Sequence, residues 1–342
     1  MSLTYANLIQ ERIEEVVLGE PTIHRQMVMF HLLSEEEGTA DYIILDEAIA
    51  NGYAHVTEID ESGTVPEVKF KNSSDKRIFM MEGEELVGAK QNRTLNLSIL
   101  APAEKEITIP VTCVESGRWS YESERFDTSD RVHYSRGRRK KMESVSENMN
   151  FYNRPEANQS EVWKEISSKE LRMESFSPTS SMGAIFEKNK GRISDYVKAF
   201  TPIENQAGML VMVGDDIVGL DLFDNKETLK KLMPKLVRSF ALDAIELNTS
   251  KKYQPRTEDA EDLLKKTATA NKSMHPAIGD GKNLRLQSEE VIGGALSLDY
   301  QMIHLSVFRN DDLPGSTNYR HARGSRVRRA SYRRSHRRRE GL

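Results

Sequence analysis

The chain has 342 residues, of which 37% are apolar and 7% aromatic, so it is long enough to bury a hydrophobic core, and its length predicts two lobes. No run approaches the roughly 18 consecutive apolar residues that a membrane-spanning helix requires, and no basic segment precedes an apolar one at the N-terminus. Cys113 is the one cysteine, which excludes an internal disulfide framework. We therefore expect a cytoplasmic protein without a membrane span.

Residues 1–120 are expected to form a β-rich lobe. Residues 27–33 (MVMFHLL) are typical of a buried strand, and a short helix near residues 45–50 follows it. Over residues 55–115, short apolar runs, many of them alternating, are separated by turn residues. About six antiparallel strands of this length favour a sandwich or a barrel-like sheet, because nothing between them is long enough for a crossover helix.

A polar segment, residues 121–159, is expected to run as a long connecting excursion between the lobes. It carries a cluster of five cations. These cations have two possible roles: contact with phosphates, or a solvated surface that balances an acidic body, and the composition favours the second. The cluster consists of Arg136, Arg138, Arg139, Lys140 and Lys141.

Residues 160–310 are expected to form a second lobe of helices and a β-hairpin, which makes the whole fold α+β. Ser160 is a candidate cap for a helix over residues 161–173, and apolar residues at helical spacing predict another helix over residues 193–200. Residues 208–223 contain two apolar runs joined by a Gly-Asp-Asp turn, which predicts a hairpin.

The helix predicted after this hairpin contains a proline. Asp224 or Asn225 can cap it, and one face is apolar over residues 229–240. Pro234 interrupts that face, and because an internal proline costs about 3 kcal/mol, we expect a kink or two separate helices. The predicted elements end with a short helix over residues 259–268 and strands near residues 295–298 and 302–308.

The C-terminal segment, residues 311–342, is expected to be a disordered, arginine-rich tail. Residues 316–342 hold ten arginines and one acid, a charge of +9 within a total of −4, which leaves −13 for the rest of the chain. So few apolar residues cannot offset the entropy of ordering. The tail is interpreted either as a weak polyanion-binding arm or as a nonfunctional extension that pairs with the acidic body. The end of the strand pattern at Phe308 favours the extension.

Sequence motifs for common catalytic centres are missing. The chain has no P-loop, no complete G-x-G-x-x-G fingerprint, no H-E-x-x-H and no paired C-x-x-C. No histidine lies between His55 and His133, where a metal-binding β-barrel of the cupin type would carry its ligands. We therefore expect no metal and no cofactor, although an all-carboxylate site stays open as an alternative.

Polar side chains are densest between two apolar runs, at residues 82–93. On an extended segment, residues two apart share a face, so Glu82 and Glu84 would point together, as would Gln91 and Arg93. The segment is interpreted either as a ligand site or as two solvated hairpin ends. Its polar residues are Glu82, Glu84, Glu85, Lys90, Gln91, Asn92 and Arg93.

Several separated sequence blocks resemble one known domain family. They are EGEELVGAKQNRTLNLSILAPAEKEITIPVTCVESGRW at residues 82–119, SPTSSMGAIFE at 177–187, IVGLDLFD at 217–224 and LMPKLVRSFALDAI at 232–245. Their content and order are similar to the ARG and Rhodanese-Phosphatase-superfamily-associated Protein domain, with the match expected over residues 22–308. The arginine-rich tail lies outside that range.

The resemblance implies a part in ADP-ribose or nucleotide metabolism. The family is named for its genomic neighbours, ADP-ribosylglycohydrolases and rhodanese-linked phosphatases, and it has no established reaction. The family motif positions that this chain carries are Glu82, Gly83, Gln91, Asn92, Arg93, Cys113, Glu115, Arg118, Trp119, Gly219, Asp221, Phe223 and Asp224.

An ADP-ribose-like ligand gives these residue types specific roles. Glu82 or Glu84 would be the catalytic acid or base, since burial beside a second carboxylate raises the pKa of a carboxyl group. Arg93 and Arg118 would hold the diphosphate, because a guanidinium is a charged bidentate donor, and Trp119 would offer a stacking face. The full ligand-binding set is Lys90, Gln91, Asn92, Arg93, Glu115, Arg118, Trp119, Asp221 and Asp224.

Each of these roles has a structural alternative. Trp119 is also suited to the core or to anchoring a hairpin, Arg118 can pair with Glu115, Cys113 is suited to a buried inert thiol, and Asp224 can cap a helix.

Two functional hypotheses therefore stay open. The first is an enzyme acting on an ADP-ribose-like or other phosphorylated nucleotide. The second is a non-catalytic module that binds such a ligand, or a partner enzyme of ADP-ribose metabolism. Convergence of Glu82 or Glu84 with Arg93 and Arg118 around one hollow would favour the enzyme.

Overall fold

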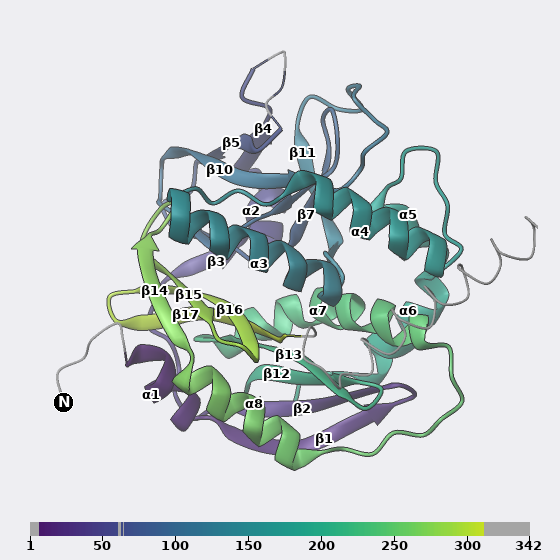
Figure 1. Cartoon of the computed structure of the whole chain (residues 1–342). Coiled ribbons are helices and arrows are strands. Elements are labelled where there is room, and N and C mark those ends of the chain that lie inside the picture. Colours follow the sequence, from purple (N-terminus) through teal and green to yellow (C-terminus); the bar gives the residue numbers. More distant parts are fainter. Residues whose placement is uncertain (1–6, 61–62, 64, 311–342) are drawn as a thin grey trace, which may run out of the picture.

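Figure 1 shows the computed structural model of the chain, which describes residues 7–60, 63 and 65–310. The arginine-rich tail predicted over residues 311–342 lies outside the described residues. The fold is α+β, with mostly antiparallel sheets and a closed six-stranded barrel, as predicted. Within the described part of the chain, no helix combines the length and the apolar character needed to cross a membrane.

An eight-stranded antiparallel sheet, which we call the large sheet, lies below the barrel in Figure 1. Its order is β1-β2-β12-β13-β17-β16-β15-β14, so two N-terminal strands pair with six strands from the second half of the chain. The predicted hairpin is β12–β13, and Val213 pairs with Asp216 at its turn. The strands are β1 (Val17–His24), β2 (Met27–Leu33), β12 (Gln206–Val213), β13 (Asp216–Phe223), β14 (Asn271–Pro276), β15 (Lys282–Gln287), β16 (Val291–Leu298) and β17 (Gln301–Arg309).

The closed barrel has the strand order β10-β5-β4-β11-β7-β8, with β8 pairing back to β10. Phe70, Leu86 and Ile109 belong to the apolar cluster that fills it, because alternate residues of a barrel strand point inward. Its strands are β4 (Ala54–Thr57), β5 (Glu67–Asn72), β7 (Glu84–Gly88), β8 (Arg93–Leu95), β10 (Glu106–Cys113) and β11 (Phe126–Val132). A small sheet adjoins it, formed by β3 (Tyr42–Ile44), β6 (Arg77–Met80) and β9 (Ile99–Ala101).

Helices pack on both faces of the large sheet. On one face, Leu236 and Phe240 join Met29 and Met209 in an apolar cluster. On the opposite face, Ile9 and other apolar residues of α1 and α8 pack against the strands. The helices on the barrel side are α3 (Ser135–Tyr152), α4 (Gln159–Arg172), α5 (Met182–Lys188), α6 (Lys190–Ala199) and α7 (Lys226–Leu247); α1 (Leu8–Glu14) and α8 (Thr257–Thr269) lie on the far side, and α2 (Leu45–Ala50) packs beside the barrel.

The secondary structure of residues 121–159 differs from the prediction of a polar excursion. Strand β11 closes the barrel between β4 and β7, and helix α3 follows at once. Three cations of the predicted solvated cluster, Arg138, Arg139 and Lys141, are buried on α3. The prediction was wrong here because the buried face of this helix combines cations with apolar residues such as Met142, which obscures the usual amphipathic pattern.

The caps of α4 and α7 are both asparagines. The side chain of Asn158 accepts a hydrogen bond from the Glu161 N–H at 3.3 Å, so the predicted cap at Ser160 was wrong by two residues. Asn225 caps α7 by accepting from the Thr228 N–H at 3.1 Å. A cap must accept from a backbone N–H of the first helical turn, and an asparagine side chain does this well.

Pro234 lies inside α7, which continues as one helix from Lys226 to Leu247. Of the two alternatives predicted for Pro234, the division into two separate helices is therefore wrong. Pro234 is exposed, whereas Met233 and Leu236 beside it are fully buried against the large sheet. Burial of the opposite face stabilises the helix and offsets the missing backbone donor.

We expect Pro234→Ala to raise the free energy of unfolding by about 1–2 kcal/mol. Restoring the backbone donor removes a cost of about 3 kcal/mol, and the greater freedom of the unfolded chain returns about 1 kcal/mol of that gain. Urea denaturation of both proteins measures the difference. Lys230→Ala, an exposed position one turn earlier, serves as the control, and a destabilised P234A would contradict this account of α7.

Candidate functional site

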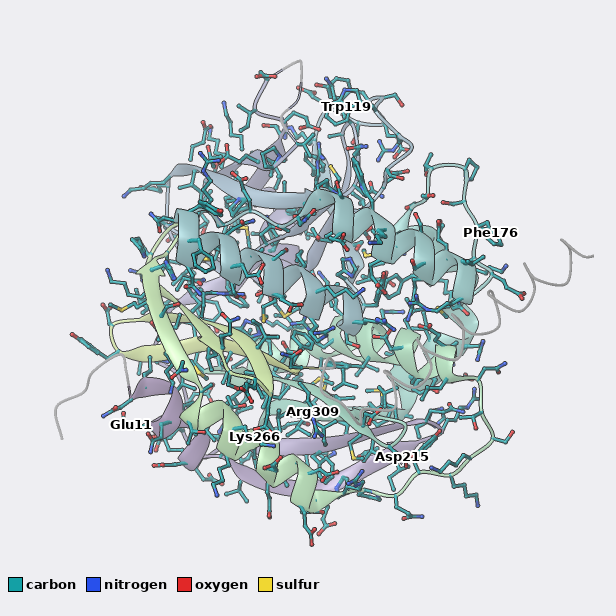
Figure 2. The ribbon with its side chains drawn as sticks, viewed as in Figure 1. Glu11, Trp119, Phe176, Asp215, Lys266 and Arg309 are labelled. Carbon is teal, nitrogen blue, oxygen red and sulfur yellow. The ribbon has the colours of Figure 1, made fainter. Side chains whose placement is uncertain are left out.

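The residues predicted to form one site lie in three different places. Glu82, Glu84 and Asp221 are buried where the barrel meets the large sheet and α7. Asp224 lines a separate pocket beside α1. The other candidates lie at the outer end of the barrel, where Figure 2 shows Trp119. This barrel-end cluster consists of Glu58, Lys90, Gln91, Asn92, Arg93, Cys113, Glu115, Arg118, Trp119 and Tyr121.

A bidentate ion pair joins α3 to the large sheet. Arg138 Nη1 and Nη2 donate to the two Asp221 carboxylate oxygens at 3.0 and 2.6 Å, and Nη2 also donates to Ser306 Oγ at 2.9 Å. Both charged side chains are fully buried. Burial raises the pKa of Asp221, but Arg138 and the nearby His304, whose Nε2 lies 3.4 Å from Asp221 Oδ1, outweigh burial and hold that pKa below its usual range.

Two further buried cations lie near this ion pair. Arg285 donates from Nε to Ser146 Oγ on α3 at 2.9 Å, and its Nη1 lies 3.7 Å from Glu82 Oε2. Lys141 donates to the carbonyl oxygen of Leu95 on β8. Burial lowers the pKa of Lys141 to about 7 against the attraction of Glu82. We call Glu82, Arg138, Lys141, Asp221, Arg285 and His304 the interior charge cluster.

Glu82 and Glu84 do not share a face. Residues 82–83 form a turn in which Gly83 has φ = 88°, and β7 begins only at Glu84. The prediction of a common direction was therefore wrong, because it assumed an extended segment. Glu84 Oε1 accepts from Lys235 Nζ at 2.8 Å, and burial raises the pKa of Glu84 against the opposing charge of Lys235. At 2% and 1% exposure, Glu82 and Glu84 are enclosed by these partners.

Arg93 is the centre of the barrel-end cluster. It pairs with Cys113 across the β8–β10 ladder, and Nη1 contacts Cys113 Sγ and donates to Gln91 Oε1 at 3.2 Å. Nη2 lies 3.6 Å from a Glu58 oxygen. In the described part of the chain, Nε and Nη2 of Arg93 have no hydrogen-bond acceptor, although the residue is 0% exposed. Burial lowers the pKa of Arg93, and Glu58 opposes this shift.

Arg118 fixes the chain that follows β10. Its Nε donates to Glu115 Oε2 at 2.8 Å, Nη1 to the Ala89 carbonyl oxygen at 2.8 Å, and Nη2 to Asn92 Oδ1 at 2.9 Å. Glu115 Oε1 accepts from Thr179 Oγ1 at 2.8 Å. The structural alternative for Arg118, pairing with Glu115, is thus present, and Asn92 is part of the same network.

Two aromatic side chains form the outer wall of this cluster. Trp119 is 48% exposed and Tyr121 is 52% exposed, so Trp119 is not a core residue. Lys90 Nζ lies 5.4 and 5.0 Å from their ring centroids, and Arg93 Cζ lies 5.6 Å from the Trp119 ring. These distances are typical of cation–π contacts. The barrel end therefore combines exposed aromatic rings with cations directly beside them.

Two further residues singled out in the sequence are Asp224, a candidate ligand or helix cap, and Cys113, a family motif position and candidate buried thiol. Asp224 precedes the Asn225 cap and accepts from Tyr42 Oη at 2.6 Å instead. Cys113 is buried, and its thiol donates to Gln91 Oε1 at 3.0 Å. Among the described residues, no group of three or more His, Cys, Asp or Glu side chains is arranged to hold a metal ion.

The model of the ARG and Rhodanese-Phosphatase-superfamily-associated Protein domain matches residues 15–308. The chain belongs to this family. The family domain spans both the interior charge cluster and the barrel-end cluster, and the resemblance seen in the sequence blocks is confirmed. No curated protein and no solved structure matches the chain.

The sequence analysis did not identify several residues of the interior charge cluster and of the barrel-end cluster. Glu58 and Tyr121 approach Arg93 and Lys90 only after the barrel closes. Arg138 and Lys141 are three residues apart on α3, a spacing that puts both on one helical face. This spacing is visible in the sequence and could have indicated that the two cations lie together. Arg285 and His304 lie on strands whose pairing the sequence does not reveal.

Lys141 gives the interior charge cluster a testable pH dependence. Its folded pKa of about 7 lies below the ordinary value of 10.5, so between these values the unfolded chain binds more protons and the free energy of unfolding rises with pH. Relative to Lys141→Met, we expect the wild type to gain up to ~1.4 kcal/mol per pH unit in this range. Urea denaturation at several pH values measures the slope. Lys164→Met, on the exposed face of α4, is the control, and equal slopes for all three proteins would contradict the burial of a titrating Lys141.

Proposed function

We propose that this protein is a non-catalytic binding module for an anionic ligand of the nucleotide or ADP-ribose class, and that the barrel-end cluster binds it. One observation carries the proposal. The Arg93 guanidinium is fully buried, yet its Nε and Nη2 have no hydrogen-bond acceptor among the described residues, and it lies next to a half-exposed tryptophan. A buried donor without an acceptor is costly, so such a group points to a ligand.

A phosphate is the natural acceptor for these two donors. Nε and one Nη of a guanidinium form a planar fork that matches two oxygens of a phosphate or carboxylate. Glu58 offers a carboxylate to Nη2, but the 3.6 Å separation exceeds hydrogen-bond distance. Lys90, which lies over both aromatic rings, adds a second cation beside the fork.

The exposed aromatic rings support a ligand that carries a base. Trp119 and Tyr121 present faces on which a flat, electron-poor ring can stack. Base stacking on an aromatic side chain is worth roughly 1–3 kcal/mol. A phosphate group and a base in one molecule define the nucleotide class, and the family name associates the domain with proteins of ADP-ribose metabolism.

The interior position of the two carboxylates proposed for catalysis favours a module over an enzyme. Glu82 and Glu84 are buried beside Arg285 and Lys235, away from the barrel-end cluster. The carboxylate closest to Arg93 is Glu58, whose Oε2 lacks a hydrogen-bond partner within the described residues. Turnover at this site would therefore depend on Glu58 rather than on Glu82 or Glu84.

Calorimetric titration with ADP-ribose, NAD and ADP tests the proposal. We expect at least one of them to bind, Trp119→Ala to weaken binding by about tenfold or more through lost stacking, and Arg93→Gln to weaken it further. Product analysis of the same mixtures is expected to find the ligand unchanged.

The control variant is Phe176→Ala, which removes another exposed aromatic ring, distant from Trp119 in Figure 2. No binding by any of the three nucleotides, or equal affinities for W119A and F176A, would sink the proposal. Ligand turnover that Glu58→Gln abolishes would instead establish the enzyme.

A further inference from the structure

Glu58, like Arg93, is a buried side chain of the barrel-end cluster with a polar atom that lacks a partner. It follows strand β4, and its side chain is 4% exposed. Oε2 has no hydrogen-bond partner among the residues that the structure describes. Oε1 accepts from the Lys90 backbone N–H at 3.3 Å and lies 3.6 Å from Arg93 Nη2. Within the described chain, an unpaired acceptor therefore lies beside two unpaired donors.

A phosphate alone would complete Arg93 and leave Glu58 unsatisfied. Phosphate oxygens accept hydrogen bonds from a guanidinium, whereas an ionised phosphate has no hydrogen atom to donate to Glu58 Oε2. A buried acceptor that stays unpaired is costly, as a buried donor is. A ligand that matches this pair of side chains therefore carries a hydrogen-bond donor close to its phosphate.

The negative charge of Glu58 also restricts the kind of phosphate that suits Arg93. Like charges a few ångströms apart repel each other, and the repulsion is stronger where water is excluded. A terminal phosphate ester carries about −1.5 to −2 charges at neutral pH, whereas a phosphate linked on both sides carries roughly −1. Beside Glu58 the smaller charge is favoured, so the site suits a phosphate within a chain better than a terminal one.

Arg93 and Glu58 are electrostatically coupled, as their short separation requires. Burial lowers the pKa of Arg93, Glu58 opposes this shift, and Arg118 adds a smaller lowering. The other buried carboxylate of the cluster, Glu115, is engaged by Arg118, whose Nε donates to it at 2.8 Å. A phosphate bound to Arg93 would therefore interact most strongly with the Glu58 carboxylate.

A sugar hydroxyl group meets these conditions. In a sugar phosphate, hydroxyl groups lie within a few bonds of a phosphate oxygen, and a hydroxyl donates a hydrogen bond to a carboxylate. The amino group of a base lies farther from the phosphate, and the Trp119 ring beside Arg93 offers that base a stacking face.

We propose that Glu58 makes the barrel-end cluster selective for ligands with a sugar hydroxyl beside a phosphate, by accepting a hydrogen bond from that hydroxyl while Arg93 binds the phosphate. This inference rests on the binding function proposed above and narrows its ligand class to nucleotides with a hydroxylated sugar. The sugar is either that of the nucleoside or a second sugar joined to the diphosphate, and two pairs of ligands distinguish these sources.

Calorimetric titration of the full chain with these ligand pairs tests the selectivity. ADP and 2′,3′-dideoxy-ADP differ in the hydroxyl groups of the nucleoside sugar. ADP-ribose and the β-methyl ester of ADP differ in the second sugar, while their phosphates carry equal charge. In one of the pairs, we expect the hydroxylated ligand to bind about tenfold more tightly than its counterpart, because only the hydroxylated ligand can donate to the buried carboxylate.

Glu58→Gln shows whether this preference comes from Glu58. The amide oxygen can keep the hydrogen bond from the Lys90 N–H, which places an NH2 group at the position of Oε2. We expect E58Q to bind the hydroxylated ligand more weakly than the wild type does and its counterpart at least as tightly, so that the preference falls below about twofold. A residue that only stabilised the fold would affect both ligands alike.

Glu122→Gln is the matched control. The Glu122 carboxylate lies 3.6 Å from Arg118 Nη2, and 63% of its side chain is exposed. This substitution removes the same charge at the barrel end without changing the pair of Arg93 and Glu58, so we expect E122Q to keep the preference of the wild type. Urea denaturation checks that each variant folds, and Glu58→Met, which removes both oxygens, replaces E58Q in the comparison if E58Q does not fold.

The results separate this inference from the binding function. If the ligands bind but neither pair differs in affinity, or if E58Q keeps the preference of the wild type, the role of Glu58 is overturned and the binding function stands. If none of the ligands binds to the wild type, the binding function and the role of Glu58 are both overturned.

Discussion

The buried ion pair between Arg138 and Asp221 is the interaction on which the architecture depends. It joins α3 to β13, while Lys141 joins the same helix to β8 of the barrel and Arg285 returns from β15 to α3. Folding removes each of these charged side chains from water, so each requires a partner that offsets the cost of its desolvation. Removing one member of such a pair costs about 3–5 kcal/mol, because the other charge stays buried and unpaired. Helix α3 therefore fixes the barrel on the large sheet.

This constraint separates the charges that hold the fold together from those that can meet a ligand. Arg138 donates to two acceptors on neighbouring strands, and Glu82 and Glu84 adjoin Arg285 and Lys235. Arg93, in contrast, keeps two N–H groups without acceptors in the described chain and lies against an exposed ring. An energetically costly arrangement of this kind makes physical sense where a bound anion supplies the missing acceptor. We therefore propose the barrel end as the part of the domain that binds a ligand.

The sequence predicted the local structure better than the assembly. Alternating apolar runs indicated the barrel, and the Gly214-Asp215 turn marked the β12–β13 hairpin correctly. Helix α3 was missed because its buried face carries Arg138 and Lys141, which read as solvated charges in the sequence. Strand β2 pairs with β12, which lies far from it in the chain. A local pattern of apolar residues cannot predict which distant strands pair. For the same reason, residues 82–93 looked like one site, whereas the turn at Gly83 directs Glu82 inward and the barrel carries Arg93 to its outer end.

The central claim is that the buried guanidinium groups of this protein divide into one that meets a ligand and others that stabilise the fold. Nuclear magnetic resonance of the arginine Nε–H groups, recorded during titration with ADP-ribose, tests it most directly. The account predicts that the Arg93 resonance moves to a new position. The resonances of Arg138 and Arg285 are expected to stay in place, because Arg138 Nη1 and Nη2 are bound to Asp221 and Arg285 Nε is bound to Ser146. A shift at Arg138 or Arg285 with a stationary Arg93 would contradict it.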